Sequence, residues 1–348
     1  MTRTTYHGRR AARIENAHIR LTVLQEGGHI AEVFDKAAGV NPLWTPPWPS
    51  IEPSAFGVEH VETYGGGSDG PLLAGIMGHN LCLDIFGPPS DEEAAAGLSA
   101  HGEGSVVAYE LRADGDALVA RANFPIAGLL FERRIDLRGA AVVIREALTN
   151  IGTSGRAIGW TQHVTLGPPF LEPGKTEFRA SAARSKVFES TFGTADYLIP
   201  AAEFEWPMAP MRDGRTSDMR VFTAAERSSA YTAHLMDPRR RDAWFVAFSP
   251  RLHLSFGYVW RRSDFPWMGI WEENRSREQS PWNGRTITRG MEFGVSPFPE
   301  TRQAMIDRGA LFGTPCFRSL AAGDSFAVEY CAIVQHADRI PESLDWPA

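Results

Sequence analysis

Apolar residues alternate with polar ones over much of the chain, and this spacing predicts strands rather than helices. Four such segments follow one another, at 106–111, 117–124, 129–137 and 141–150. Turn sequences such as Asp114-Gly115-Asp116 and Arg138-Gly139 separate them. Consecutive strands joined by tight turns are typical of an antiparallel meander, so we predict one over this part of the chain.

Strand-like segments continue on both sides of the meander. We predict a hairpin over 14–24 and further strands at 27–35, 78–86, 244–248, 253–260, 267–271, 286–293 and 325–334. Two short helices are expected at 91–96, where Ser90 and Glu93 form a capping-box pattern, and at 302–308. The glycine-rich run 65–70 lacks the Gly-Lys-Ser/Thr of a phosphate loop, and we expect both it and 200–218 to be loops. Because no stretch resembles a linker, the sequence predicts one all-β domain over residues 1–348.

Composition narrows the classes of function. The 348 residues carry a formal net charge of −7 and no long basic run, which argues against a nucleic-acid partner. No apolar segment is long enough for a membrane span, and we expect a cytoplasmic location. The cysteines Cys82, Cys316 and Cys331 are widely spaced and predict neither a disulfide framework nor a zinc site. The ten tryptophans are more informative, because exposed indole faces stack on sugars, although core packing is the alternative for most of them.

The stretch 159–170 contains the first candidate for chemistry. Alternation along this predicted strand places Trp160 and Gln162 on one face and His163 on the other. An imidazole has an ordinary pKa near 6.5, so His163 can donate or accept a proton at neutral pH. The alternative is a strand histidine that is bonded to a neighbouring carbonyl, and the stretch by itself favours neither reading.

Several segments, taken in order, resemble the galactose mutarotase-like superfamily, which includes the aldose 1-epimerases. The resemblance covers most of the chain and rests on Gly28-His29-Ile30-Ala31-Glu32, His101-Gly102, the segment from Leu148 to His163, Arg289-Gly290-Met291-Glu292 and the closing run 320–325. It implies a large twisted antiparallel β-sandwich with a carbohydrate cleft across one sheet. It also implies interconversion of sugar anomers without a cofactor or a bound metal.

The resemblance further implies roles for three residues. Glu292 would be the general base, His163 the general acid at the ring oxygen, and His101 a second donor near the ring. We expect His163 to act in its protonated form, with its pKa raised by a nearby carboxylate such as Glu292. The alternatives are a surface ion pair between Glu292 and Arg289, and a turn position for His101.

The chain also departs from the superfamily's pattern. Aldose 1-epimerases usually follow the acid histidine with Pro-Tyr-Phe, whereas Val164-Thr165-Leu166 stands here, and no Asn-x-Arg element is recognisable in the first third. A tryptophan-rich run occurs instead at 267–285. We expect an apolar stacking wall from Trp267, Trp271 and Trp282, and hydroxyl-binding side chains from Glu273, Asn274, Arg275 and Arg285. Core tryptophans followed by a charged loop are the alternative.

The sequence therefore predicts an aldose 1-epimerase-like isomerase whose partner is a small carbohydrate. Two other functions stay open. One is a sugar-binding protein without activity, and the other is a sugar lyase, isomerase or metal-dependent hydrolase on the same fold. His79, counted among the residues near the substrate, would join His101, His163 and Glu292 as a metal ligand in the last case. These four lack His-x-His or His-x-x-x-His spacing, so that alternative is the weaker one.

Overall fold

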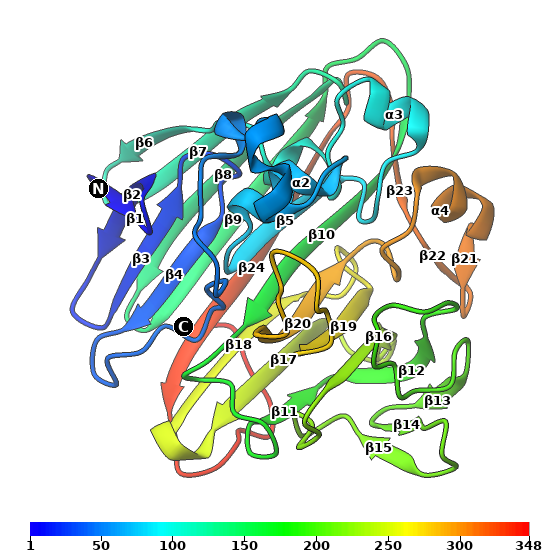
Figure 1. Ribbon diagram of the computed structural model, residues 1–348. Helices are drawn as coiled ribbons and strands as arrows, with labels where there is room; N and C mark the ends of the chain where they lie inside the picture. The colour runs from blue at the N-terminus through cyan, green and yellow to red at the C-terminus, as the bar shows by residue number, and fades with distance from the viewer. Residues whose placement is uncertain (348) are drawn as a thin grey trace.

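The computed structural model describes residues 1–347, and within this range strands dominate the chain (Figure 1). Most strands lie in two large antiparallel sheets, which confirms the all-β prediction. The larger sheet has 12 strands, one of which, β23 (Arg318–Leu320), pairs beside the main path with the start of β10. Along the main path its order is β1 (Thr2–Tyr6), β2 (Arg9–Glu15), β3 (Ile19–Leu24), β4 (Ile30–Asp35), β5 (His79–Asp84), β10 (Arg156–Leu166), β20 (Ile287–Gly294), β19 (Trp267–Asn274), β16 (Ser228–Met236), β12 (Ala182–Val187) and β13 (Glu203–Glu205).

The second sheet has 8 strands and contains the predicted meander. Strands β6 to β9 follow one another in space as they do in sequence. Residues 117–124 form a strand as predicted, whereas β6 begins four residues after its predicted start, and a 3-10 turn at residues 103–105 precedes it. The order of this sheet is β11 (Glu177–Ala180), β17 (Asp242–Ser249), β18 (Leu254–Arg261), β24 (Ser325–His336), β9 (Ala141–Asn150), β8 (Leu129–Arg138), β7 (Ala117–Phe124) and β6 (Glu110–Asp114).

Short elements connect the sheets. Both expected helices are present: Ser90 accepts a hydrogen bond from the amide of Glu93 at the start of the first, and Thr301 caps the second. The glycine-rich run 65–70 is not wholly a loop, because a helix begins at Asp69, and 200–218 contains short strands. The remaining elements are α1 (Val61–Tyr64), α2 (Asp69–Gly75), α3 (Asp91–Ala95), α4 (Arg302–Arg308), the hairpin strands β14 (Met208–Pro210), β15 (Thr216–Asp218), β21 (Ala310–Leu311) and β22 (Thr314–Pro315), and 3-10 turns at Pro53–Ala55, Val58–His60, Glu103–Ser105 and Pro250–Leu252.

The main apolar core lies between the two sheets, which face one another as a sandwich (Figure 1). Trp260 of the smaller sheet stacks on Phe293 of the larger one, with ring centroids 4.2 Å apart. Trp160 of β10 also points into this core, as the alternation of its strand predicted. A second apolar cluster, which includes Trp44, Trp271 and Trp282, covers the outer face of the larger sheet. The outer face is therefore sheltered from solvent, and a pocket is built there.

A buried polar network crosses the core between the sheets. Glu146 of β9 accepts hydrogen bonds from Arg133 (2.7 Å), Gln162 (2.6 Å) and Tyr330 (2.6 Å). The imidazole of His79 then bridges Gln162 (2.9 Å) and the hydroxyl of Tyr258 (3.0 Å). Burial lowers the pKa of His79 to about 3, so its ring is neutral at neutral pH. Because these partners satisfy one another, polar groups are accommodated inside an otherwise apolar sandwich.

No helix within residues 1–347 combines the length and the apolar character that crossing a membrane requires.

Candidate active site

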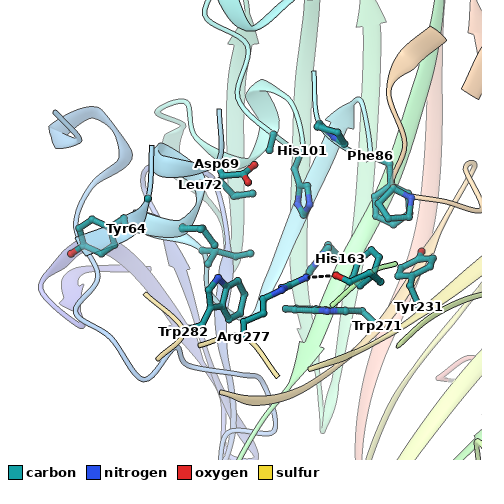
Figure 2. Close-up of a pocket in the computed structure, with 18 of the residues that line it drawn as sticks. Tyr64, Asp69, Leu72, Phe86, His101, His163, Tyr231, Trp271, Arg277 and Trp282 are labelled. Carbon is teal, nitrogen blue, oxygen red and sulfur yellow. Dashed lines mark hydrogen bonds between the residues drawn. The ribbon is translucent and has the colours of Figure 1, made fainter. Parts of the chain in front are cut away.

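A pocket of about 460 Å³ opens on the outer face of the larger sheet. Its floor comes from the middle of that sheet, where β10, β20, β19 and β16 lie side by side. Segments around α1, α2 and residues 277–282 form its walls. Figure 2 shows His101, His163, Tyr231 and Trp271 gathered on one side, with Tyr64 and Trp282 on the other. Its volume lies within the range of small-molecule sites, about 300–1,000 Å³.

The floor brings His163 and Glu292 into direct contact. His163 lies on β10 and Glu292 on the adjacent β20, and both side chains project from the outer face of the sheet. The Nε2 atom of His163 is 3.1 Å from the Oε1 atom of Glu292, and both residues are buried. Arg289 points to the opposite side of the sheet, where it donates to the carbonyl of Met219. Glu292 therefore pairs with His163 and does not form the surface ion pair with Arg289 that was the alternative.

Burial sets the protonation of this pair. It raises the pKa of Glu292 well above the ordinary value, and it lowers the pKa of His163 well below its own. The prediction that a nearby carboxylate raises the pKa of His163 is wrong, because the loss of hydration lowers that pKa and the neighbouring His101 lowers it further. The favoured form of the pair is therefore neutral, with a carboxylic acid at Glu292 and an uncharged imidazole at His163.

His101 is the third predicted residue in the pocket. Its ring lies beside that of His163, with centroids 4.9 Å apart, and burial lowers its pKa to about 4. Its φ of 64° is left-handed, which is uncommon outside glycine. Two backbone hydrogen bonds hold this conformation, from the amide of His101 to Gly87 and from the amide of Leu83 to His101. His101 is a turn residue, as the alternative stated, and that turn points its ring into the pocket.

Two glycines leave room for the side chains on the floor. A Cβ atom on Gly269 would lie 2.0 Å from the hydroxyl of Tyr231, and one on Gly290 would lie 2.4 Å from Oε1 of Glu292. Gly269 is the cross-strand partner of Glu292, and Gly290 is the partner of Trp271. Gly269 and Gly290 thus alternate with the large side chains of Trp271 and Glu292 on this face of β19 and β20, which gives the pocket its depth.

Two of the three tryptophans predicted for the stacking wall lie at the pocket, and their role in binding stays a prediction. Trp271 lies next to His163, with ring centroids 5.8 Å apart, and Trp282 packs edge-to-face on Trp271 at 6.0 Å. Both line the pocket. Trp267 does not, because it lies four residues earlier on β19 and donates its indole N–H to the carbonyl of Pro315. Alternation predicts on which face of a strand a side chain lies, but it does not predict how far along the strand that side chain is from the pocket.

The expected hydroxyl-binding residues do not line the pocket in the part of the chain that the structure describes. Buried Glu273 accepts hydrogen bonds from Ser276 and so stabilises the turn after β19. Asn274 donates to the carbonyl of Ala225 and joins the end of β19 to the segment before β16. Arg275 takes the left-handed conformation in that turn. Arg285 is exposed beyond it. His79 belongs to the network between the sheets, on the opposite face from the pocket.

The pocket also contains polar residues that we did not predict. Arg277, Tyr231 and Asp69 all line it. Arg277 follows the turn just described, two residues after Arg275, and it is this arginine that lines the pocket. Tyr231 lies on β16, where every residue is buried and the sequence lacks alternation. Asp69 falls in the glycine-rich run that we had taken for a plain loop. Ser68 at the N-cap and the acidic Asp69 in the first turn, before an apolar stretch, are the signals that indicate this helix.

The residues that the structure describes contain no group of three or more His, Cys, Asp or Glu side chains that could hold a metal ion. Of the four ligands considered for a metal site, His79 lies between the sheets and the other three lie in the pocket. The metal site considered from the sequence is therefore not assembled. The donors that remain together are suited to moving a proton.

Comparison with known proteins identifies the fold. No protein-family model and no curated protein matches the sequence. Among solved structures, a candidate aldose 1-epimerase from Klebsiella pneumoniae superposes with a TM-score of 0.65 at 13% identity, over 95% of this chain and 80% of that one. One from Escherichia coli K12 gives 0.61 at 13% identity, over 94% and 99%. A galactose mutarotase-like protein from Clostridium acetobutylicum gives 0.61 at 11% identity, over 96% and 98%.

The fold is therefore the galactose mutarotase-like β-sandwich, as the sequence resemblance implied. The superpositions establish the architecture, and at sequence identities of 11–13% the reaction has to be argued from the pocket.

Proposed function

We propose that this protein binds a small sugar in the pocket and interconverts its anomers, as an aldose 1-epimerase-like isomerase. The observation that carries the proposal is the contact between His163 and Glu292, 3.1 Å apart on a pocket floor beside the indole of Trp271. The ring oxygen and the C1 hydroxyl of a cyclic sugar are both bonded to C1. An acid and a base that act on these two oxygens must therefore lie close together, as this pair does.

The reaction needs one proton to leave and one to arrive. Glu292 accepts the proton of the C1 hydroxyl while His163 donates a proton to the ring oxygen. The bond between C1 and the ring oxygen breaks and the C1 oxygen becomes a carbonyl. Rotation about C1–C2 presents the other face of the carbonyl, and the ring closes as both protons return. No oxidant, reductant or external proton is needed.

The surroundings of the pair favour the open-chain stage. When the ring is open, Glu292 is protonated and His163 is neutral. This is the form that burial favours, because burial raises the pKa of Glu292 and lowers that of His163. Burial of the pair therefore favours transfer of both protons in the ring-opening direction. Before the reaction, sugar hydroxyls that replace water stabilise the form in which Glu292 is a carboxylate and His163 is an imidazolium.

Neighbouring residues fit auxiliary roles in this reaction. Neutral His101 lies beside His163, and its Nδ1 atom has no hydrogen-bond partner within residues 1–347. We assign it a hydrogen bond to the ring region of a sugar, the role that the sequence resemblance implied. The face of Trp271 gives the C–H face of a sugar ring an apolar surface, and Trp282 packs edge-to-face beside it.

Nuclear magnetic resonance exchange spectroscopy on common aldoses tests the proposal. The wild type should accelerate anomer exchange for at least one sugar, and Glu292→Gln should reduce that rate by about 100- to 10,000-fold while sugar binding is retained. The amide preserves the shape of the side chain but cannot accept the C1 proton. Binding without exchange in the wild type would instead identify a sugar-binding protein without this activity.

A further inference from the structure

Arg277 is a buried cation on the wall of the pocket, and the proposed reaction does not use it. Its side chain is 19% exposed, and its guanidinium lies over the ring of Trp282 at 4.7 Å and near that of Trp271 at 5.6 Å. Burial lowers its pKa, yet a guanidinium stays charged in proteins. A charge in this position needs acceptors to offset its lost hydration.

The protein supplies few of those acceptors. The Nη2 atom of Arg277 donates to the carbonyl of Phe192 at a long 3.3 Å. Its Nε atom lies 3.7 Å from Glu273, whose carboxylate already accepts two 2.6 Å bonds from Ser276. Nη1 makes no hydrogen bond with any group of residues 1–347. A guanidinium has five N–H donors, so most of the donors of Arg277 are available on the pocket side.

Trp271 connects this cation with the reacting pair. The indole of Trp271 lies 5.8 Å from the ring of His163 and 5.6 Å from the guanidinium carbon of Arg277. Figure 2 shows Arg277 and His163 close to Trp271 in the same pocket. A sugar with its C1 atom at His163 and Glu292 and its ring over Trp271 would extend its far end toward Arg277.

We infer that the sugar bound in this pocket carries an oxyanion, a carboxylate or a phosphate, at the end away from C1, and that Arg277 binds it. This inference rests on the proposed function and names its substrate class. The planar fork of a guanidinium matches two oxygens of either group, whereas a neutral hydroxyl offers only one. The rings of Trp282 and Trp271 restrain the guanidinium of Arg277, so the Arg277 side chain loses little further conformational entropy when an oxyanion binds.

Three carboxylates surround this cation, and two of them are already engaged. Glu273 is bonded to Ser276, and Asp196 accepts hydrogen bonds from the amides of Phe192 and Gly193 and from Ser229. Asp69 lies in the pocket, makes no side-chain hydrogen bond within residues 1–347, and has its pKa raised by burial. It does not neutralise Arg277 by contact, and its carboxyl is available for a sugar hydroxyl.

The test compares three probes that share one ring: glucose, glucuronate and glucose 6-phosphate, with the corresponding galactose set in parallel. Affinity is measured by titration calorimetry on the wild type, Arg277→Gln and Arg277→Lys. At least one anionic sugar should bind more tightly than its neutral parent. Arg277→Gln should lower this preference by about 10- to 100-fold, the size of a lost hydrogen-bonded charge. Arg277→Lys, which keeps the charge but not the fork, should give an intermediate value.

Arg285→Gln is the matched control, because Arg285 is exposed outside the pocket, and it should keep the wild-type preference. Comparing the affinities of the carboxylate sugars and the phosphate sugars shows which oxyanion Arg277 binds. The inference is overturned if neither anionic set binds more tightly than its parent, or if Arg277→Gln weakens parent and anion alike. Anion binding through Arg277 without anomer exchange would contradict the proposed function alone. Exchange of neutral sugars without an anion preference would contradict this inference alone.

Discussion

The absence of a side chain at Gly269 leaves space on the pocket floor for Tyr231 and Glu292. A methyl group at this position would meet the Tyr231 hydroxyl at 2.0 Å and Oε2 of Glu292 at 3.4 Å. Gly269→Ala should therefore displace Tyr231 into the pocket, lower the free energy of unfolding by about 1–3 kcal/mol and abolish sugar binding. Urea denaturation and calorimetry check the two effects.

Gly155→Ala is the control for that substitution. Its Cβ atom would meet only ordinary contacts at 3.8 Å, at an exposed turn away from the pocket. It should leave binding unchanged and alter stability little. If Gly269→Ala behaved in the same way, the packing of Tyr231 over the floor would be refuted.

The protonation of His163 and Glu292 determines how the rate depends on pH. With ordinary pKa values, activity would be confined to the interval between 4.5 for the carboxyl and 6.5 for the imidazole. Burial opposes both adding a proton to the neutral pair of Glu292 and His163 and removing one from it. The state in which the pair holds one proton therefore persists over a wider range of pH. The profile of kcat/KM should therefore show a plateau that extends below 4.5 and above 6.5. A narrow maximum between those values would contradict this account.

At the scale of elements, β10 is the strand for which the sequence pattern best predicted the direction of the side chains. Its alternation places Trp160 and Gln162 toward the core and His163 toward the pocket, as predicted. The prediction worked because each face of β10 meets different surroundings. β16 was missed because both of its faces are buried, so small and polar residues replace an alternating pattern. With β16 unrecognised, Tyr231 had no position in the predicted site.

The buried histidine on β5 makes stability depend on pH. In the unfolded chain the His79 imidazole has an ordinary pKa of 6.5, but burial lowers it to about 3 in the folded protein. A lowered pKa stabilises the fold above pH 6.5, and this contribution is lost as pH falls toward 3, because the unfolded state binds a proton that the native state does not. The loss is about 1.4 kcal/mol per pH unit.

His79→Gln removes this linkage. Urea unfolding at pH 6 and pH 5 should show a smaller loss of stability in the variant than in the wild type, by about 1.4 kcal/mol. His18→Gln, at an exposed histidine, should reproduce the wild-type difference. Equal differences in all three proteins would show that His79 is not a neutral core residue.

At the scale of the molecule, the sequence predicted the class of fold and the three residues that meet in the pocket. His101, His163 and Glu292 come from positions about 60 and 130 residues apart along the chain, and only pairing of β10 with β5 and β20 brings them together. Local patterns do not encode such pairing, so it came from the resemblance alone. The same limit explains why Arg277 and Asp69, which lie on connections between strands, were missed. The division into a single domain over residues 1–348 stays a prediction.

The central claim is that His163 and Glu292 act as one proton-transferring pair, and a double-mutant cycle tests it most directly. Anomer exchange is measured for the wild type, Glu292→Gln, His163→Asn and the double variant, with circular dichroism confirming that each is folded. Each single variant should lose at least about 100-fold in kcat/KM, and the double variant should lose little more than the worse of the two, because the pair works as a unit. Losses that multiply, or near-normal exchange in Glu292→Gln, would contradict the account.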